Sequence, residues 1–171
     1  MQVCFIGHRD IERTSELENR LRQTVEELII KGATTFLFGS KSDFDTLAWE
    51  TVTQLKQKYP FIKRVYVRSA FQYISSAYEQ YLLNYYEHTY FPERAQNAGK
   101  CSYIKRNYEM IDCCLFCVFY YNPNHLTPLK KQPKNSISLP KRRTSGTKIA
   151  FNYAVKSKKQ IINLFDKNST V

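Results

Sequence analysis

Short apolar runs alternate along the chain with longer stretches whose apolar residues recur at helical spacing. Runs of this length, bounded by glycines and polar residues, are typical of strands buried on both faces. They cover residues 3–6, 35–38, 62–67, 115–121 and 160–165. Because repeated strand–helix units form parallel strands joined by right-handed crossovers, the alternation predicts an α/β, Rossmann-like three-layer fold with a mostly parallel sheet of about five strands.

The stretches between the runs predict helices. The first begins at an expected N-cap, Ser15, with Glu18 completing a capping box, and it ends near Gly32. The other helices are expected from Gly39-Ser40 to just before Pro60 and over residues 73–86, 103–111 and 145–156. The stretch that contains His88, Tyr90, Phe91 and Pro92 has no period and is expected to be irregular.

The chain of 171 residues shows no internal repeat, so it predicts a single domain. Residues 122–144 contain four prolines and no periodicity, and they predict a long loop within that domain. No stretch approaches the roughly 18 apolar residues of a membrane span. The first residues also lack the basic and apolar regions of a secretion signal. We therefore expect a cytoplasmic protein with no membrane partner.

The net charge of +11 lies partly in the predicted loop. Between Leu129 and Arg143 there is no acidic residue, and six of the 26 basic side chains fall there: Lys130, Lys131, Lys134, Lys141, Arg142 and Arg143. Such a segment either contacts phosphate groups or forms a solvated, mobile loop. The charge therefore keeps nucleic acid among the candidate partners.

Three of the five cysteines, Cys113, Cys114 and Cys117, include a C-x-x-C spacing. A structural zinc site needs four ligands, and no second Cys or His pair lies at a suitable spacing. The three cysteines also fall in the apolar run that ends at Tyr121, which predicts packing in a buried strand. We expect free thiols, no metal and no cofactor.

Polar motifs that contain glycine follow the predicted strands, at the edge where parallel sheets bind ligands. Gly7, His8 and Arg9 come after the first strand. Glycine allows the backbone to approach a ligand closely, and Arg9 can bind a phosphate or carboxylate through two N–H groups. The alternative is a tight turn with an exposed arginine. His8 could act as an acid or base, whereas His88 and His125 are expected to be structural or exposed.

The second motif contains Gly39, Ser40, Asp43 and Asp45 and leads into a helix. Free N–H groups and the dipole at the start of a helix favour an anion. The two aspartates could cap the helix, bind ribose hydroxyls or repel phosphate. The motif therefore predicts either an anion site or ordinary helix capping.

The third motif is Ser145, Gly146 and Thr147, which begin the last predicted helix and add hydroxyl donors to its free N–H groups. A capping role explains Ser145 by itself but not the whole triplet. Arg106 and Asn107 form a fourth feature on the helix before the fourth strand. They are either part of the site or a solvated helix face.

Taken in this order, the motifs resemble those of the SLOG superfamily, which includes the Smf/DprA DNA-processing proteins and the Lonely Guy phosphoribohydrolases. The likeness is greatest to its small, YpsA-like bacterial branch. It covers nearly the whole chain through Gly7-His8-Arg9, Gly39-Ser40 with Phe44-Asp45-x-x-Ala48-x-Glu50, Arg106-Asn107, and Ser145-Gly146-Thr147. The resemblance implies a Rossmann-like fold with a pocket for nucleotides or nucleotide-derived molecules.

Two positions depart from this pattern. In Lonely Guy enzymes a glutamate follows the last glycine-rich motif and works with an arginine in N-glycosidic cleavage, whereas Ala150 stands at that position here. Asp43 stands where relatives often have glycine and adds negative charge near the expected phosphate site. Without the glutamate the mechanism lacks its acid/base group. No catalytic residue is assigned, and Asp45 and Glu50 are the candidates.

Three functions follow from these features. The leading hypothesis is binding or sensing of a nucleotide-like small molecule, with charge from Arg9 and Arg106 and with Asp45 at a ribose or base edge. The second is nucleotide N-glycosidic hydrolysis, with Asp45, Glu50 or His8 in place of the missing glutamate. The third is a DprA-like DNA-binding module with residues 129–143 on backbone phosphates. The aromatic residues of the segment 71–91 predict either a homo-oligomer or a dense core.

Overall fold

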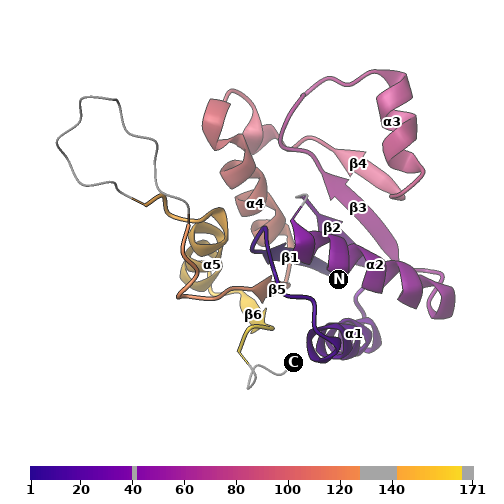
Figure 1. The fold of residues 1–171 in the computed structure, drawn as a ribbon. Coiled ribbons are helices and arrows are strands. Elements are labelled where there is room, and N and C mark those ends of the chain that lie inside the picture. The colour runs from indigo at the N-terminus through magenta and orange to yellow at the C-terminus, as the bar shows by residue number, and fades with distance from the viewer. Residues whose placement is uncertain (40–41, 128–141, 167–171) are drawn as a thin grey trace.

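The computed structural model describes residues 1–39, 42–127 and 142–166. In these ranges, six parallel strands form one sheet in the order β4-β3-β2-β1-β5-β6 (Figure 1). The strands are β1 (Gln2–Gly7), β2 (Thr35–Phe38), β3 (Lys63–Val67), β4 (His88–Tyr90), β5 (Phe116–Tyr120) and β6 (Gln160–Asn163). The α/β, Rossmann-like three-layer fold is confirmed.

The strand order contains one reversal, at β1. The chain moves outward from β1 to β4 and then returns to place β5 on the other side of β1. Val3 of β1 is therefore in register with Phe36 of β2 on one side and with Phe116 of β5 on the other. Open α/β sheets bind ligands in the crevice outside the carboxyl ends of such strands. Here that crevice lies after Gly7 and Tyr120.

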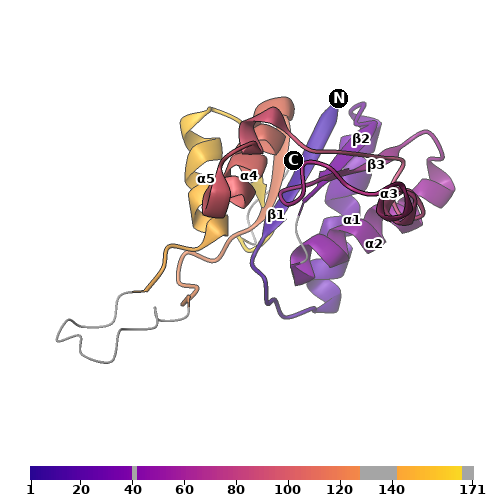
Figure 2. The ribbon, with the colours of Figure 1, turned by 90° about the horizontal axis from the view of Figure 1, so that it is seen from above.

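Helices cover both faces of the sheet (Figure 2). Because crossovers between parallel strands are right-handed as a rule, the reversal at β1 moves the helices that follow to the opposite face. On one side are α1 (Ser15–Ile30), α2 (Asp43–Lys58) and the short α3 (Ser76–Leu83); on the other are α4 (Ser102–Cys113) and α5 (Gly146–Lys156). Two 3-10 turns, Glu93–Ala95 and Gly99–Cys101, lead from β4 into α4.

Alternate residues of the central strands feed two apolar clusters. Val3 and Phe5 point toward α1 and α2, where Phe5 packs on Phe36 and Phe38 with ring centroids 6.0 and 5.3 Å apart. Cys4 and Ile6 point to the other side and pack with residues of α4 and α5. The two-residue period of the strands therefore builds both layers of the core.

Two expectations for the middle of the chain were wrong. The segment containing His88 is the edge strand β4, not an irregular stretch, and it raises the strand number from about five to six among the described residues. The helix expected over residues 73–86 is shortened to α3, which begins after its N-cap Ser75 and buries only Leu82. An edge strand of three residues has no apolar run to reveal it.

The start of the first helix also differs from expectation. Thr14, not Ser15, is the N-cap of α1, and its side chain accepts a hydrogen bond of 3.2 Å from the N–H of Leu17. Ser15 is the first helical residue, so the expected capping box with Glu18 is one residue out of register. Thr14 and Ser15 both have side chains that suit the N-cap position, and the backbone geometry decides which of them occupies it.

The cysteines are divided between helix and strand. Cys113 ends α4 and is exposed, so its predicted place in a buried strand is wrong. Cys114 and Cys117 are buried and pack with Cys4. In the described part of the chain, the cysteines are free thiols, and no three His, Cys, Asp or Glu side chains are grouped to hold a metal ion.

Some predicted features lie outside the described residues. They are Ser40 and four basic residues of the predicted loop, Lys130, Lys131, Lys134 and Lys141. The described ranges contain no helix with both the length and the apolar character that crossing a bilayer requires.

Candidate functional site

A cavity of about 680 Å³ lies at the carboxyl edge of the sheet, beside the crevice between β1 and β5. Its walls come from the ends of β1 and β2, the segment after β5, and the helices α4 and α5. Nine of the predicted site residues line it: Gly7, His8, Arg9, Gly39, Arg106, Asn107, Ser145, Gly146 and Thr147. The structure therefore brings together motifs that are up to 140 residues apart in the sequence.

Gly7 is required by close packing at the end of β1. A Cβ atom added there would lie 2.4 Å from the ring of Phe44, which is fully buried. The Gly7 carbonyl accepts a hydrogen bond of 2.9 Å from Oγ1 of Thr147, which joins β1 to the start of α5. The loop that continues is held by the N–H of Asp43, which donates to the Arg9 carbonyl at 2.7 Å. Arg9 itself is exposed.

Gly39 makes room for a buried arginine. Arg106 of α4 is 3% exposed, and a Cβ on Gly39 would lie 2.6 Å from its Nη1 atom. The guanidinium donates from Nη1 to the Val67 carbonyl at 3.2 Å and from Nε to Oδ1 of Asn107 at 2.9 Å. Arg106 is therefore fixed in the cavity wall and is not part of a solvated helix face.

Burial changes the electrostatics of Arg106. Loss of water lowers the pKa of its guanidinium, and the negative charge of Asp45 opposes that change. Arginine stays protonated in proteins because its pKa starts so high. The cavity wall therefore carries a permanent positive charge in a site from which water is partly excluded, where it attracts an anion more strongly than it would in bulk water.

The start of α5 forms another part of the wall. Ser145 is the N-cap, and its Oγ accepts a hydrogen bond of 3.0 Å from the N–H of Lys148. The N–H groups of Gly146 and Thr147 belong to the first turn, where a helix offers no carbonyl partner of its own. The hydroxyl of Thr147 donates its hydrogen to the Gly7 carbonyl. The hydroxyl of Ser145, the other predicted donor, accepts a hydrogen bond and keeps its own hydrogen for a ligand.

Two stacked histidines lie in the same cavity wall. The rings of His8 and His125 are parallel to within 21°, with centroids 4.0 Å apart. Nε2 of His8 accepts a hydrogen bond of 3.0 Å from the N–H of Asn122, so that nitrogen carries no proton. Burial and, second to it, the neighbouring His125 lower the pKa of His8 to about 4. His8 is therefore neutral at pH 7.

The predicted acidic residues lie away from this cavity. Asp43 is exposed, and its carboxylate accepts a hydrogen bond of 3.4 Å from the N–H of Ile11. Glu50 pairs with Arg13. Asp45 is buried in the first turn of α2 and lines a neighbouring cavity walled by aromatic side chains. Ala150 is buried in the apolar cluster between the sheet and α5.

Other wall residues were not predicted as site residues, among them Tyr103, Met110, His125 and Thr127. Tyr103 and Met110 are three residues before and four residues after Arg106, so helical spacing from that arginine would have found them. The expectation that His125 is merely structural or exposed missed its stacking on His8. That contact depends on β5 lying next to β1, which the alternation of elements does not reveal.

Comparison with known proteins gives a structural likeness. No protein-family model matches the sequence, and no curated protein is similar to it. A solved structure of DNA processing protein A from Helicobacter pylori, described for its unique mode of binding single-stranded DNA, superposes with a TM-score of 0.54 and 16% sequence identity. The superposition covers 99% of this chain and 68% of that one. The two proteins therefore share a fold, which agrees with the resemblance to the Smf/DprA proteins, while membership of the YpsA-like branch stays a prediction.

Proposed function

We propose that the chain binds single-stranded DNA and holds a backbone phosphate in the cavity at the carboxyl edge of the sheet. The observation that carries this proposal is the meeting of the α5 N-terminus with the buried Arg106 guanidinium in one cavity wall. N–H groups at a helix start and a desolvated arginine both favour a phosphate group. Arg9 adds an exposed positive charge at the cavity mouth.

Two further facts favour a strand over a free nucleotide. The whole chain carries a net charge of +11, which suits a ligand with many phosphates. The structural neighbour of similar fold binds single-stranded DNA. Together they move the DNA-binding hypothesis ahead of the nucleotide-sensing hypothesis that the motifs favour.

A free nucleotide is the second candidate, because a cavity of about 680 Å³ has the size of an ordinary small-molecule pocket. The same phosphate groups would lie against α5 and Arg106. Nucleotide N-glycosidic hydrolysis has less support, because neither of its candidate carboxylates lines this cavity. Among the described residues of the cavity wall, the one carboxylate is that of Asp10. The earlier candidates Asp45 and Glu50 contribute to other parts of the molecule.

Fluorescence anisotropy with a labelled oligo-dT tests the proposal, using a strand longer than the roughly 4–16 nucleotides that one domain occupies. The affinity should fall linearly with salt on a double-logarithmic plot because phosphate contacts release counterions. Arg9→Gln should weaken binding at low salt and reduce the slope by about one. Since Arg9 is exposed, its loss should leave the folded structure intact.

The matched control is Lys31→Gln, which removes the same charge from an exposed position beside the amino ends of the strands. If the DNA lies at the carboxyl edge, Lys31→Gln should retain the wild-type slope. Equal losses in both variants would show that the charge of the whole surface binds DNA, and not this cavity. Displacement of the strand by equimolar mononucleotide would favour the second candidate.

A further inference from the structure

A second cavity, of about 420 Å³, lies on the other side of the first turn of α2. Ser42 at the start of this turn lines the first cavity, whereas Asp45 and Thr46 line the second. Arg106 interacts electrostatically with Asp45 and Tyr66, both in the wall of the second cavity. The two cavities are therefore neighbours across the first turn of α2.

The walls of the second cavity are mainly aromatic. Its rings come from α2, β3, α3 and the segment that follows α3: Trp49, Tyr66, Tyr78, Tyr81, Tyr85 and Tyr86. We call this group the aromatic cavity. The centroids of Tyr66 and Tyr86 are 5.2 Å apart, and those of Tyr81 and Tyr85 are 5.3 Å apart. The rings of these pairs are tilted by 32° and 60°, so they pack as one aromatic cluster that presents both ring faces and ring edges.

Several of these rings are open to solvent and are not needed by the core. Tyr81 is 54% exposed, Tyr85 44% and Tyr78 39%. The helix that carries Tyr78 and Tyr81 buries only Leu82. A cluster of exposed rings costs solubility, so its presence at one place on a surface indicates a binding role.

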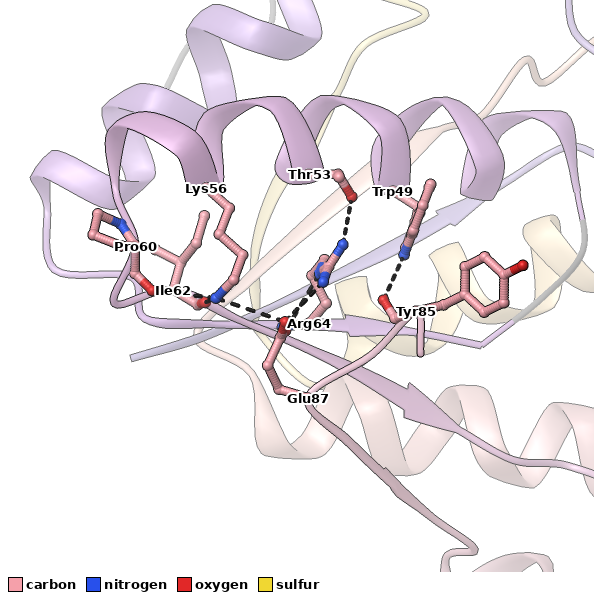
Figure 3. Close-up of polar contacts among 8 residues, drawn as sticks. All are labelled: Trp49, Thr53, Lys56, Pro60, Ile62, Arg64, Tyr85 and Glu87. Atoms are coloured by element: carbon pink, nitrogen blue, oxygen red, sulfur yellow. Dashed lines mark hydrogen bonds and ion pairs between the residues drawn. The ribbon is translucent and has the colours of Figure 1, made fainter. Parts of the chain in front are cut away.

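Polar contacts join the elements that carry two wall residues of the aromatic cavity, Trp49 and Tyr85 (Figure 3). Nε1 of Trp49 donates to the Tyr85 carbonyl at 3.3 Å, which links α2 to the segment after α3. The Arg64 guanidinium lies 5.5 Å from the Trp49 ring centroid and donates to Thr53 and Glu87 at 2.9 and 2.7 Å. A wall that is fixed before binding loses little conformational entropy when a ligand arrives.

The charge of the aromatic cavity selects against phosphate. Asp45 is its one charged wall residue in the described part of the chain, and it is negative. A flat, neutral ring with N–H donors therefore suits this cavity, whereas an anion suits the neighbouring one with Arg9 and Arg106. Nucleobases have this chemistry, and they stack on aromatic side chains whatever their sequence.

We propose that the aromatic cavity receives a base of the same strand whose phosphate occupies the cavity beside α5 and Arg106. This inference rests on the proposed function. It assigns Tyr78, Tyr81 and Tyr85 to base stacking and places Asp45 near the polar edge of the base. One strand then uses both cavities, with its phosphate and its base on opposite sides of the first turn of α2.

The test compares oligo-dT with an abasic strand of equal length, which keeps the phosphates and lacks the bases. Wild-type protein should bind oligo-dT on the order of tenfold more tightly than the abasic strand, as stacking of one base provides. Tyr81→Ala should lower the affinity for oligo-dT by a similar factor and leave the abasic strand unchanged. Tyr81→Phe keeps the ring and should retain wild-type affinity.

Phe61→Ala is the matched control, because Phe61 is an exposed ring near the amino end of β3 and should not affect either strand. Trp49 is the single tryptophan, so its fluorescence reports on this cavity directly. Oligo-dT should change that fluorescence, and the abasic strand should not.

Two results distinguish the inference from the function beneath it. If wild-type protein binds both strands equally, or if Tyr81→Ala weakens both alike, the base site is excluded while DNA binding stands. If wild-type protein binds neither strand, the proposed function fails, and the base site fails with it.

Discussion

At the scale of single residues, burial decides what the charged and titratable groups of the cavity can do. Arg106 keeps its charge in the wall, although burial lowers its pKa, because the pKa of a guanidinium starts so high and the negative charge of Asp45 opposes the change. His8 loses its charge because burial and, second to it, the neighbouring His125 lower its pKa to about 4. Two groups that are both basic in the sequence therefore differ in charge at neutral pH.

The pKa of His8 leads to a prediction for stability. In the unfolded chain His8 has a pKa near 6.5, and in the folded chain its pKa is about 4. As the pH falls below 6.5, the unfolded chain takes up the proton first, so the free energy of unfolding decreases. The loss should continue down to about pH 4 and should be absent above about pH 7.

Between pH 7.5 and pH 5, His8 should account for a loss of about 2 kcal/mol in the free energy of unfolding. Urea denaturation at both pH values measures it, and His8→Asn removes the titrating group while keeping an acceptor for Asn122. The variant should lose less stability than wild type over this interval. The same decrease in both proteins would mean that His8 is protonated in the folded state.

Individual site residues were predictable where they sit directly after a strand or begin a helix. Gly39 and Arg106 were both identified as site residues. The reason for the glycine was not predictable, because the arginine that fills the space beside it lies 67 positions further along the chain, in α4. His125 was missed because its partner His8 meets it only across the β1–β5 pair. Contacts of this kind depend on strand order, which local patterns do not contain.

At the scale of elements, apolar content decided which predictions succeeded. β2 was predicted with the observed bounds because it is an inner strand whose apolar residues Phe36, Leu37 and Phe38 are buried on both faces of the sheet. β4 was missed because it is an edge strand whose one buried residue, Thr89, is polar. α3 was predicted too long because its two tyrosines, Tyr78 and Tyr81, line the aromatic cavity and do not pack in the core.

The start of α1 allows a matched pair of substitutions. Thr14→Ala should lower the free energy of unfolding by about 1 kcal/mol, because it removes the acceptor for the N–H of Leu17. Ser15→Ala, one position later in the first turn, should change it by less than about 0.5 kcal/mol. Urea denaturation of the two variants measures the difference. A larger loss for Ser15→Ala would assign the cap to Ser15.

At the scale of the whole molecule, charge and topology act together. The reversal at β1 gathers the ends of β1, β2 and β5 and the starts of two helices at one edge. The net charge of +11 gives the chain a long-range attraction to anionic polymers. Long-range attraction sets how strongly a strand is drawn to the surface, whereas the two cavities set where it binds.

These two contributions can be separated by changing the charge alone. Replacing Lys130, Lys131, Lys134 and Lys141 with glutamine lowers the net charge from +11 to +7. We expect the salt slope for oligo-dT to decrease by up to about 3 units if those lysines contact phosphates. The ratio of affinities for oligo-dT and the abasic strand should stay at its wild-type value. A change in that ratio would show that the lysines contribute to recognition of the base.

The bond between Thr147 and Gly7 has a consequence for how this molecule can vary. It fixes the start of α5 on β1, and Thr127 is hydrogen-bonded to Arg142 and Arg143 on the way there. The position of α5 therefore does not depend on the length of chain that joins Thr127 to Arg142. Doubling that length costs only about 0.6 kcal/mol in closure entropy. We therefore expect a reporter peptide inserted between Thr127 and Arg142 to leave α5 and both cavities in place.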